Sequence, residues 1–186
     1  YVCLFKNYLR KAGASLIHSH SQILSLPVIP IELENEYKVC DDFYKKMGIN
    51  MYEYLIEEEI KYEKRVIYNN NNFLVFIPEI CKYAGDTVIL FKENIYFDEI
   101  NEMKLKDLSI IMKKLFSKLY EEYDDCPFNL YLHTHPVNEN NDYKDKYNVH
   151  IHIVPRKFNF GGFELSTGMY VSSVNSEDIA KKIKFD

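Results

Sequence analysis

Several features are missing from this chain of 186 residues, and each absence narrows its function. The four cysteines are far apart, so no Cys-x-x-Cys pair indicates a zinc knuckle or a redox motif. No apolar run is long enough to cross a bilayer, and no signal peptide is visible. A net charge of -5 argues against a general nucleic-acid-binding surface, although a local basic pocket stays compatible with it. We therefore expect reduced, structural cysteines in a soluble, cytoplasmic protein with no nucleic-acid or membrane partner.

The pattern of apolar and turn-forming residues predicts an α+β protein whose strands are mostly antiparallel. Strands are expected over residues 1–6, 16–26, 66–68, 73–77, 87–91, 128–135 and 147–156. Helices are expected over residues 32–65, divided at Gly48 and Asn50, over residues 101–123, and after a cap at Asn175 or Ser176. Residues 161–174 are rich in small side chains and suit close backbone contact with a ligand.

This order of elements divides the chain into three segments. Residues 1–30 contain only two strands, which are marginally stable in water and need a larger sheet to join. They are expected to be the end of one unit whose beginning is missing, since the chain starts at Tyr1 inside an apolar stretch typical of the interior of a longer protein. Residues 31–65 connect this piece to a second unit, residues 66–186. Both units contain a His-x-His strand, which indicates internal duplication.

All six histidines fall into three pairs with one residue between them, His18/His20, His133/His135 and His150/His152. Residues two apart in a β-strand point to the same face, so each pair would present two imidazoles side by side. Imidazole is the commonest metal ligand in proteins and a competent nucleophile near neutral pH. The three pairs therefore indicate metal binding or nucleophilic chemistry.

The first pair lies in the run His18-Ser19-His20-Ser21-Gln22, shortly after Gly13 and Ser15. An imidazole can attack phosphorus to give a labile N–P bond, and the amide of Gln22 can donate to a phosphate oxygen. Backbone N–H groups of residues 13–15 can cradle an anion. Together these groups are the parts of a nucleotidyl-transfer site. The alternative is a strand that only exposes polar residues, and it accounts less well for the combination.

These residues resemble a known family. Phe5-Lys6-Asn7, Ala12-Gly13-Ala14-Ser15 and the His18–Gln22 run resemble galactose-1-phosphate uridylyltransferases of the histidine-triad superfamily, a group that includes ADP-glucose phosphorylase-like enzymes. The resemblance continues through His150-Ile151-His152-Ile153-Val154-Pro155 and Gly162-Phe163-Glu164, so it covers nearly the whole chain. It implies a histidine-triad-like antiparallel sheet with helices, with one complete unit and the C-terminal part of another.

The resemblance also implies roles for individual residues. His20 would be the nucleophile that forms a covalent nucleotidyl-histidine, and Gln22 would bind the transferred phosphoryl group. The remaining matches are nucleotide-phosphate contacts at Asn7, Gly13 and Ser15, a hexose contact at Glu164, and a structural zinc ligand at His18. The Cys-x-x-Cys of that zinc site is absent, so His18 has no visible partner ligand. Ser19 replaces a proline common in the transferases and brings the chain closer to the ADP-glucose phosphorylase-like group.

A second metal site is implied by the family, built from one glutamate and three histidines. Glu36, His150 and His152 match three of these ligands. The third histidine is His133 or His135; the following proline favours His133, but the loop can shift the register. One carboxylate with three imidazoles suits zinc or iron. The alternative is a polar, solvated strand face.

The resemblance implies a nucleotidyltransferase that moves a nucleoside monophosphate between hexose 1-phosphates through His20, in a ping-pong reaction of carbohydrate metabolism. A nucleotide-sugar phosphorylase or hydrolase of the same superfamily is the alternative. A third interpretation is a metal-binding piece that is inactive alone. The expected substrates are a nucleotide sugar and a hexose 1-phosphate, the expected cofactor is zinc, and a homodimer is expected.

Overall fold

The computed structural model describes residues 1–137, 143–157, 160–172 and 174–186. Its strands are β1 (Val2–Tyr8), β2 (Ser21–Ser25), β3 (Val66–Asn69), β4 (Phe73–Phe76), β5 (Thr87–Phe91), β6 (Phe128–His133) and β7 (His150–Pro155). Its α-helices are α1 (Ile31–Met47), α2 (Met51–Tyr62), α3 (Glu102–Tyr123), α4 (Gly162–Thr167) and α5 (Ser176–Ile183). The α+β class is confirmed. None of the helices in these ranges is long and apolar enough to span a membrane.

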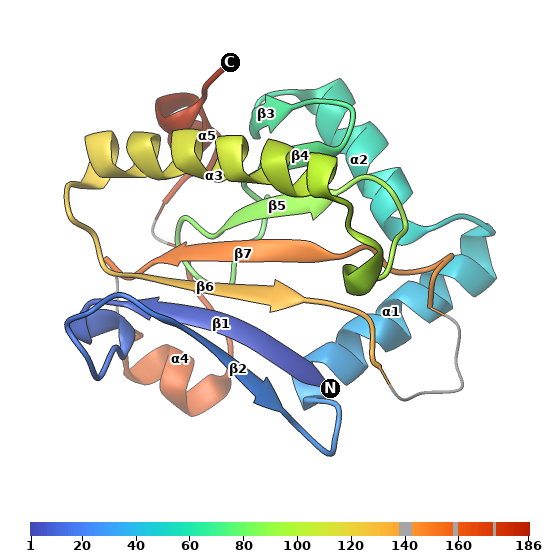
Figure 1. The fold of residues 1–186 in the computed structure, drawn as a ribbon, viewed down its shortest axis with the longest axis horizontal. Helices are drawn as coiled ribbons and strands as arrows, with labels where there is room; N and C mark the ends of the chain where they lie inside the picture. The colour runs from blue at the N-terminus through green and yellow to red at the C-terminus, as the bar shows by residue number, and fades with distance from the viewer. Residues whose placement is uncertain (138–142, 158–159, 173) are drawn as a thin grey trace.

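The strands form one antiparallel sheet in the order β2-β1-β6-β7-β5-β4-β3 (Figure 1). The first strand of the chain therefore lies inside the sheet, where it pairs with both β2 and β6. This pairing supplies the larger sheet that residues 1–30 need. Its register also places distant residues in one row, because Phe5 faces both Gln22 and Tyr131, and Tyr131 faces His152.

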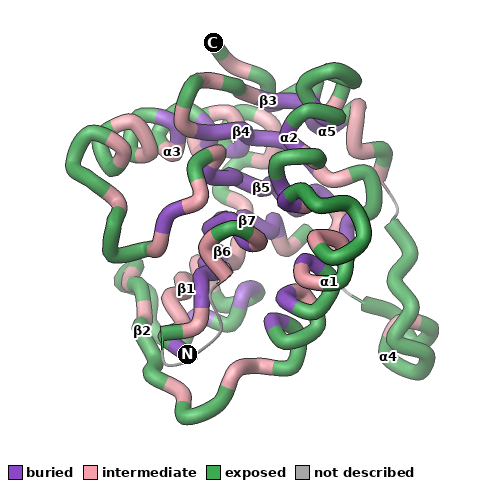
Figure 2. Tube along the Cα trace, turned by 90° about the vertical axis from the view of Figure 1, so that its right-hand side faces the viewer, coloured by how far each residue is buried: buried purple, intermediate pink, exposed green. Residues whose placement is uncertain are grey.

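Each face of the sheet is covered by different helices, and Figure 2 shows the sheet lying between α3 and α1. Alternate residues of a strand point to opposite faces, so the sheet has two cores. On one face Ile89, Ile151 and Ile153 pack with the stripe Ile111, Leu115 and Leu119 of α3 and with α5. On the other face Leu74, Val88 and Leu90 pack with Tyr37 of α1 and Tyr52 of α2.

The helix breaks lie where the sequence predicts them. Gly48 ends α1 with a φ of 73°, a left-handed conformation that a glycine adopts without strain. Asn50 then begins α2, and its side chain accepts a hydrogen bond from the backbone N–H of Tyr52. The short connection turns α2 back across the sheet beside α1, so that both helices meet the same face.

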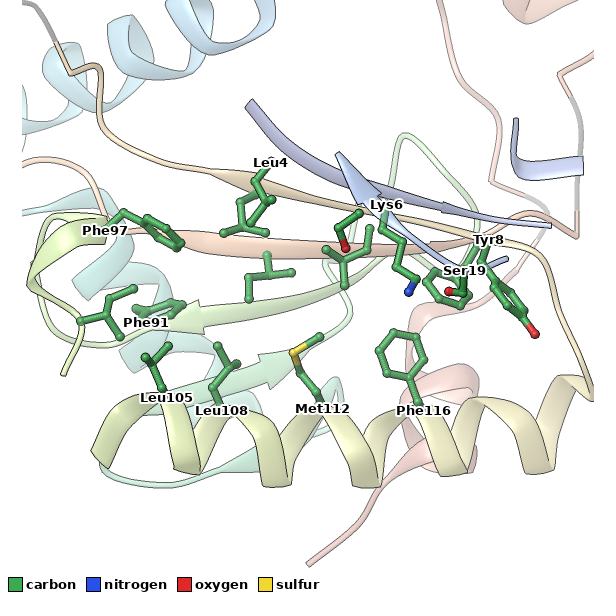
Figure 3. A pocket seen from close by; sticks show the side chains of 16 residues that line it. Leu4, Lys6, Tyr8, Ser19, Phe91, Phe97, Leu105, Leu108, Met112 and Phe116 are labelled. Atoms are coloured by element: carbon green, nitrogen blue, oxygen red, sulfur yellow. The ribbon is translucent and has the colours of Figure 1, made fainter. Parts of the chain in front are cut away.

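The β1–β2 end of the sheet is less covered than its centre. Between this end and α3 lies a cavity of about 570 Å³ (Figure 3). Leu4, Lys6 and Tyr8 of β1 line one side of it, and Met112 and Phe116 of α3 line the other. Ile23 of β2 lies opposite Leu4 and keeps 69% of its surface exposed.

The structure differs from the expected elements around the histidines. The strand expected over residues 16–26 begins only at Ser21, so His18 and His20 precede β2 rather than lie in it. The reason is that the β1–β2 pairing ends at Lys6 and Ser21, and β2 is an edge strand with no second neighbour to extend it. The helix α4 was not expected; it lies in the stretch of small residues, 161–174, for which the sequence analysis predicts no helix or strand.

Candidate functional site

Three imidazoles converge on the sheet face that α1 and α2 cover. His133 is the last residue of β6, and it faces His150 of β7, with His152 two positions further on. One nitrogen from each ring lies within 4.8 Å of the corresponding nitrogens of the other two. The ring centroids are 5.0 Å apart for His133 and His150, 4.9 Å for His133 and His152, and 5.1 Å for His150 and His152. Such a group can hold a metal ion.

The structure separates the two candidates for the third histidine. His133 belongs to the cluster, whereas His135 lies beyond the end of β6 and is buried elsewhere. The Nε2 of His135 is 2.9 Å from the carbonyl oxygen of Tyr147, and its ring packs 4.5 Å from that of Tyr96. The pairing of β6 with β7 therefore brings His133, and not His135, to the other two histidines.

Helix α1 brings Glu36 to the same cluster. One carboxylate oxygen, Oε2, is 2.9 Å from the Nδ1 of His133, and the other, Oε1, is 3.2 Å from the Nε2 of His150. Tyr52 of α2 and Tyr147, in the segment before β7, both donate their hydroxyl hydrogens to Oε1. The carboxylate is thus anchored on two helices and two strands at once.

Each of the three imidazoles has a hydrogen-bond acceptor at Nδ1. For His133 it is Glu36, and for His150 it is the carbonyl oxygen of Asn148, at 2.9 Å. For His152 it is Asp86, whose two carboxylate oxygens are 2.9 and 3.1 Å from Nδ1. An acceptor at one ring nitrogen fixes the tautomer and leaves the other nitrogen to bind a metal, which is the arrangement that metal-binding histidines almost always have.

Asp86 and Tyr52 are residues that the sequence analysis missed. Asp86 directly precedes β5, and only the pairing of β5 with β7 brings it to His152. A single sequence carries no signal of that pairing. The spacing of Tyr52 could have suggested that it is buried, because it lies on one stripe of α2 with Ile56 and Glu59.

The carboxylate and the imidazoles of the cluster shift one another's pKa values. Burial raises the pKa of Glu36, but His150 and His133 outweigh that effect and hold it well below its usual value. Burial lowers the pKa of His150, but the neighbouring Glu36 outweighs it, so the pKa ends above its usual value. Burial lowers the pKa of His133, and Glu36 offsets this only in part. These shifts favour the ionised form of Glu36 and the protonated form of His150, and they disfavour the protonated form of His133.

The cluster opens into a cavity of about 680 Å³. Besides the cluster, its walls include Tyr131 of β6, Val88 of β5 and the segment from Pro78 to Tyr83. The three imidazoles therefore lie beside a space that a metal ion or a small ligand can enter.

His20 of the predicted nucleophile segment directly precedes β2, whose Gln22 points to the same face of the sheet as the cluster. His20 is half-buried, and its Nδ1 is 2.8 Å from the carbonyl oxygen of His18. If Nδ1–H donates this hydrogen bond, the lone pair on Nε2 stays available. Gln22 follows in β2, in the row that runs through Phe5 and Tyr131 to His152. Three steps between neighbouring strands separate Gln22 from His152, a distance of about 14 Å.

Two of the predicted phosphate contacts lie close together. Asn129 donates a hydrogen bond of 2.7 Å to the side-chain oxygen of Asn7 and another of 2.8 Å to the carbonyl of Ala12. Gly13 has a φ of 88°, and a Cβ there would lie 3.8 Å from the amide nitrogen of Asn7. Asn7 and the Ala12–Gly13 turn are thus held against the beginning of β6.

The side chains of the remaining predicted residues make no described contact with His20, Gln22, Asn7 or the histidine cluster. Ser15 and His18 are exposed. Glu164 accepts a hydrogen bond of 2.9 Å from the backbone N–H of Gly161 at the start of α4. Figure 2 shows α4 standing away from the body of the protein. A hexose contact at Glu164 therefore stays a prediction.

Residues 2–165 match the family described as galactose-1-phosphate uridyl transferase, C-terminal domain. The chain is 30% identical over 185 residues to ADP-glucose phosphorylase of Arabidopsis thaliana, a match that covers 99% of this chain and 51% of that protein. It is 27% identical over 194 residues to galactose-1-phosphate uridylyltransferase of Saccharomyces cerevisiae, covering 99% and 52%.

A solved structure agrees with this match. The structure of ADP-glucose phosphorylase from Arabidopsis thaliana with bound ADP-glucose has a TM-score of 0.87 and 30% identity, and the likeness covers 100% of this chain and 59% of that one. The chain therefore spans about half the length of the curated relatives that it matches.

Proposed function

The chain belongs to the galactose-1-phosphate uridyl transferase C-terminal domain family, and on that premise we propose that the whole protein transfers nucleotidyl groups through a covalent intermediate on His20. The observation that carries the proposal is the orientation of this imidazole. Its Nδ1 faces the carbonyl oxygen of His18 at 2.8 Å, so the tautomer that donates there has a nucleophilic Nε2. The substrate of such a reaction is a nucleotide sugar.

In the first step, Nε2 of neutral His20 attacks the α-phosphorus of the nucleotide sugar. An N–P bond forms, the P–O bond to the sugar phosphate breaks, and hexose 1-phosphate leaves. Gln22, the second residue of β2, lies opposite Phe5 and would donate its amide N–H to an oxygen of the transferred phosphoryl group. The Asn7 side chain and the Gly13 turn, which lie together at the beginning of β6, would contact the remaining phosphate oxygens.

In the second step, an oxygen of the acceptor attacks the same phosphorus, the N–P bond breaks, and neutral His20 is restored. A second hexose 1-phosphate as acceptor gives a transferase, inorganic phosphate gives a phosphorylase, and water gives a hydrolase. Ser19 and the match to ADP-glucose phosphorylase favour testing phosphate as the acceptor alongside a hexose 1-phosphate.

The histidine cluster is proposed as a metal centre. His133, His150 and His152 would hold the ion, and Glu36 would supply the carboxylate of the site. The fit is supported by the acceptors that His150 and His152 have at Nδ1, and by the position of Glu36, whose Oε1 is 3.2 Å from the Nε2 of His150. Nitrogen and oxygen donors of this kind suit zinc or iron, and a bound ion would cross-link the ends of β6 and β7.

The test is the intact mass of the protein after incubation with UDP-glucose or ADP-glucose. A gain of one nucleotidyl group identifies the base, and the gain should vanish in His20→Ala but persist in Ser25→Ala, a change at the far end of β2, the strand that His20 precedes. Release of the adduct by hexose 1-phosphate, phosphate or water then distinguishes the three reactions. An adduct that survives His20→Ala would contradict the proposal. Metal binding without an adduct would support the third interpretation, an inactive metal-binding piece.

A further inference from the structure

The side-chain amide of Asn129, near the beginning of β6, takes part in three hydrogen bonds. Its Nδ2 donates to the side-chain oxygen of Asn7 at 2.7 Å and to the carbonyl oxygen of Ala12 at 2.8 Å. Its Oδ1 accepts a hydrogen bond of 3.1 Å from the guanidinium of Arg156, which follows β7. Both hydrogens of this amide are therefore used, and the side chain joins the ends of β1 and β7 to the Ala12–Gly13 turn.

The chemistry of two of these partners fixes which way the Asn129 amide points. A guanidinium can only donate hydrogen bonds, and a backbone carbonyl oxygen can only accept them. Arg156 therefore requires the oxygen of Asn129, and Ala12 requires its nitrogen. The second hydrogen on that nitrogen also requires an acceptor, so Asn7 must turn its own oxygen toward Asn129.

The same bonds determine the direction of the Asn7 amide nitrogen. It lies 3.8 Å from the position that a Cβ of Gly13 would occupy, beside an exposed turn. No acceptor among the described residues is hydrogen-bonded to this nitrogen. The backbone N–H groups of Gly13 and Ala14 already donate to the carbonyl oxygens of Arg10 and Leu9. The nitrogen of Asn7 is therefore an open donor beside Gly13, where an anion can approach.

We infer that Asn129 and Arg156 are positioning residues for nucleotidyl transfer: Arg156 fixes the amide of Asn129, which holds the Asn7 nitrogen toward the phosphates of the nucleotide sugar. This role rests on the proposed function, in which Asn7 contacts phosphate oxygens. A reversed Asn7 amide would present its oxygen to the phosphates, and two acceptors that face each other repel. Both residues act through Asn7 and not on the substrate, so their effects on the reaction should depend on its amide.

The test is the rate at which the nucleotidyl group appears on His20 with ADP-glucose or UDP-glucose, followed by intact mass. Asn129→Asp keeps the acceptor for Arg156 but has no hydrogen to donate, so Asn7 should reverse its amide. The rate should fall about 100-fold, the usual loss when a hydrogen-bond donor to the transition state is removed or misplaced. Asn7→Ala should lose about as much, and Asn7→Ala/Asn129→Asp should be no slower than Asn7→Ala.

Arg156→Met is a second variant, because it leaves the oxygen of Asn129 without its fixed donor. It should slow the reaction in the wild-type background and have no further effect in Asn7→Ala, whereas Arg156→Lys retains a donor and should keep more of the rate. The matched control is Asp125→Ala. It removes a hydrogen bond of 2.8 Å from Tyr8 of β1 to the segment before β6, outside the Asn129 amide, and its rate should match the wild type.

Non-additive losses support the inference, since residues that act on one amide share one effect. Losses that add in the double variants would overturn it, because they would mean that Asn129 or Arg156 acts on the substrate directly or on the fold in general. Thermal unfolding identifies the variants that are folded under the assay conditions. A wild-type protein that forms no adduct on His20 would contradict the proposed function and the inference with it.

Discussion

The His150/His152 pair lies inside the sheet, whereas the His18/His20 pair precedes its edge strand, so the two pairs have opposite surroundings. His150 and His152 lie on β7, between β6 and β5, and each ring has a hydrogen-bond partner within the chain. His18 and His20 precede β2, an edge strand, and His18 is exposed. Burial with fixed partners suits a permanent metal ligand, whereas an accessible imidazole with one free nitrogen suits a nucleophile that must meet a substrate.

The largest expected difference between the two regions is in stability. Glu36→Ala should lower the free energy of unfolding by about 3 kcal/mol, at the low end for a buried ion pair because this side chain keeps 21% exposure. It leaves His133 and the hydroxyls of Tyr52 and Tyr147 without their acceptor, and it removes the ion-pair partner of His150. Urea unfolding in EDTA measures the change. The exposed Glu34 on the same helix provides the control, and Glu34→Ala and His20→Ala should each stay within about 0.5 kcal/mol of the wild type. Equal losses for Glu36 and His20 would contradict the comparison.

A second expected difference concerns the apolar side chains of one face. Ile151 of β7 is 3% exposed and Ile23 of β2 is 69% exposed, although both point toward α3. Ile151→Ala should cost about 2–5 kcal/mol through lost burial and a residual cavity. Ile23→Ala should change the free energy of unfolding by about 0.5 kcal/mol or less. A large loss at Ile23 in denaturant unfolding would mean that this edge is covered in solution.

Metal binding should distinguish the histidines individually. Zinc at 100 times its dissociation constant should raise the free energy of unfolding by about 2.7 kcal/mol. His133→Ala and His152→Ala should lose this increment, and His135→Ala should keep it, even if its basal stability differs. The measurement is thermal unfolding with zinc and with EDTA. An increment lost in His135→Ala and kept in His133→Ala would assign the third ligand to the other histidine.

The smallest expected effect is a difference in thiol reactivity. Burial is the main cause that raises the pKa of Cys40 to about 12 and that of Cys81 to about 11. Their reactive thiolates are therefore scarce at pH 8, and both side chains are buried. Cys3 of β1 and Cys126 are only half-buried and should be alkylated first. Mass spectrometry after timed iodoacetamide treatment checks this order, and full labelling in urea is the control. Faster labelling of Cys40 than of Cys3 would contradict it.

Local patterns predicted most of the elements. The breaks at Gly48 and Asn50 and the cap at Asn175 depend on nearby residues, and both predictions are confirmed. The length of β2 was not predictable, because it depends on its pairing with β1 and on the lack of a second neighbour. The apolar residues before His18 look like strand, but nothing in the fold extends the ladder to them.

The candidate site was only partly predictable from the sequence, because some of its residues are marked by local patterns and others meet only through strand pairing. Its histidines were found from their spacing, and Glu36 from the family resemblance. The choice of His133 over His135 depended on where β6 ends. Asp86, Tyr52 and Tyr147 come from three separate elements, and they meet the cluster only through the β5–β7 pairing and the return of α2 across the sheet. Such partners require the tertiary structure.

In both histidine pairs, one imidazole contacts a backbone carbonyl oxygen, and this contact affects what mutations can change. The Nδ1 of His20 faces the carbonyl oxygen of residue 18, and the Nδ1 of His150 faces that of residue 148, each two positions earlier. A carbonyl oxygen belongs to the main chain, so no amino-acid replacement at position 18 or 148 removes it. A substitution at the acceptor residue therefore leaves the tautomer of the imidazole unchanged. Neighbouring side chains can diverge while the nitrogen that meets a substrate or a metal ion stays the same.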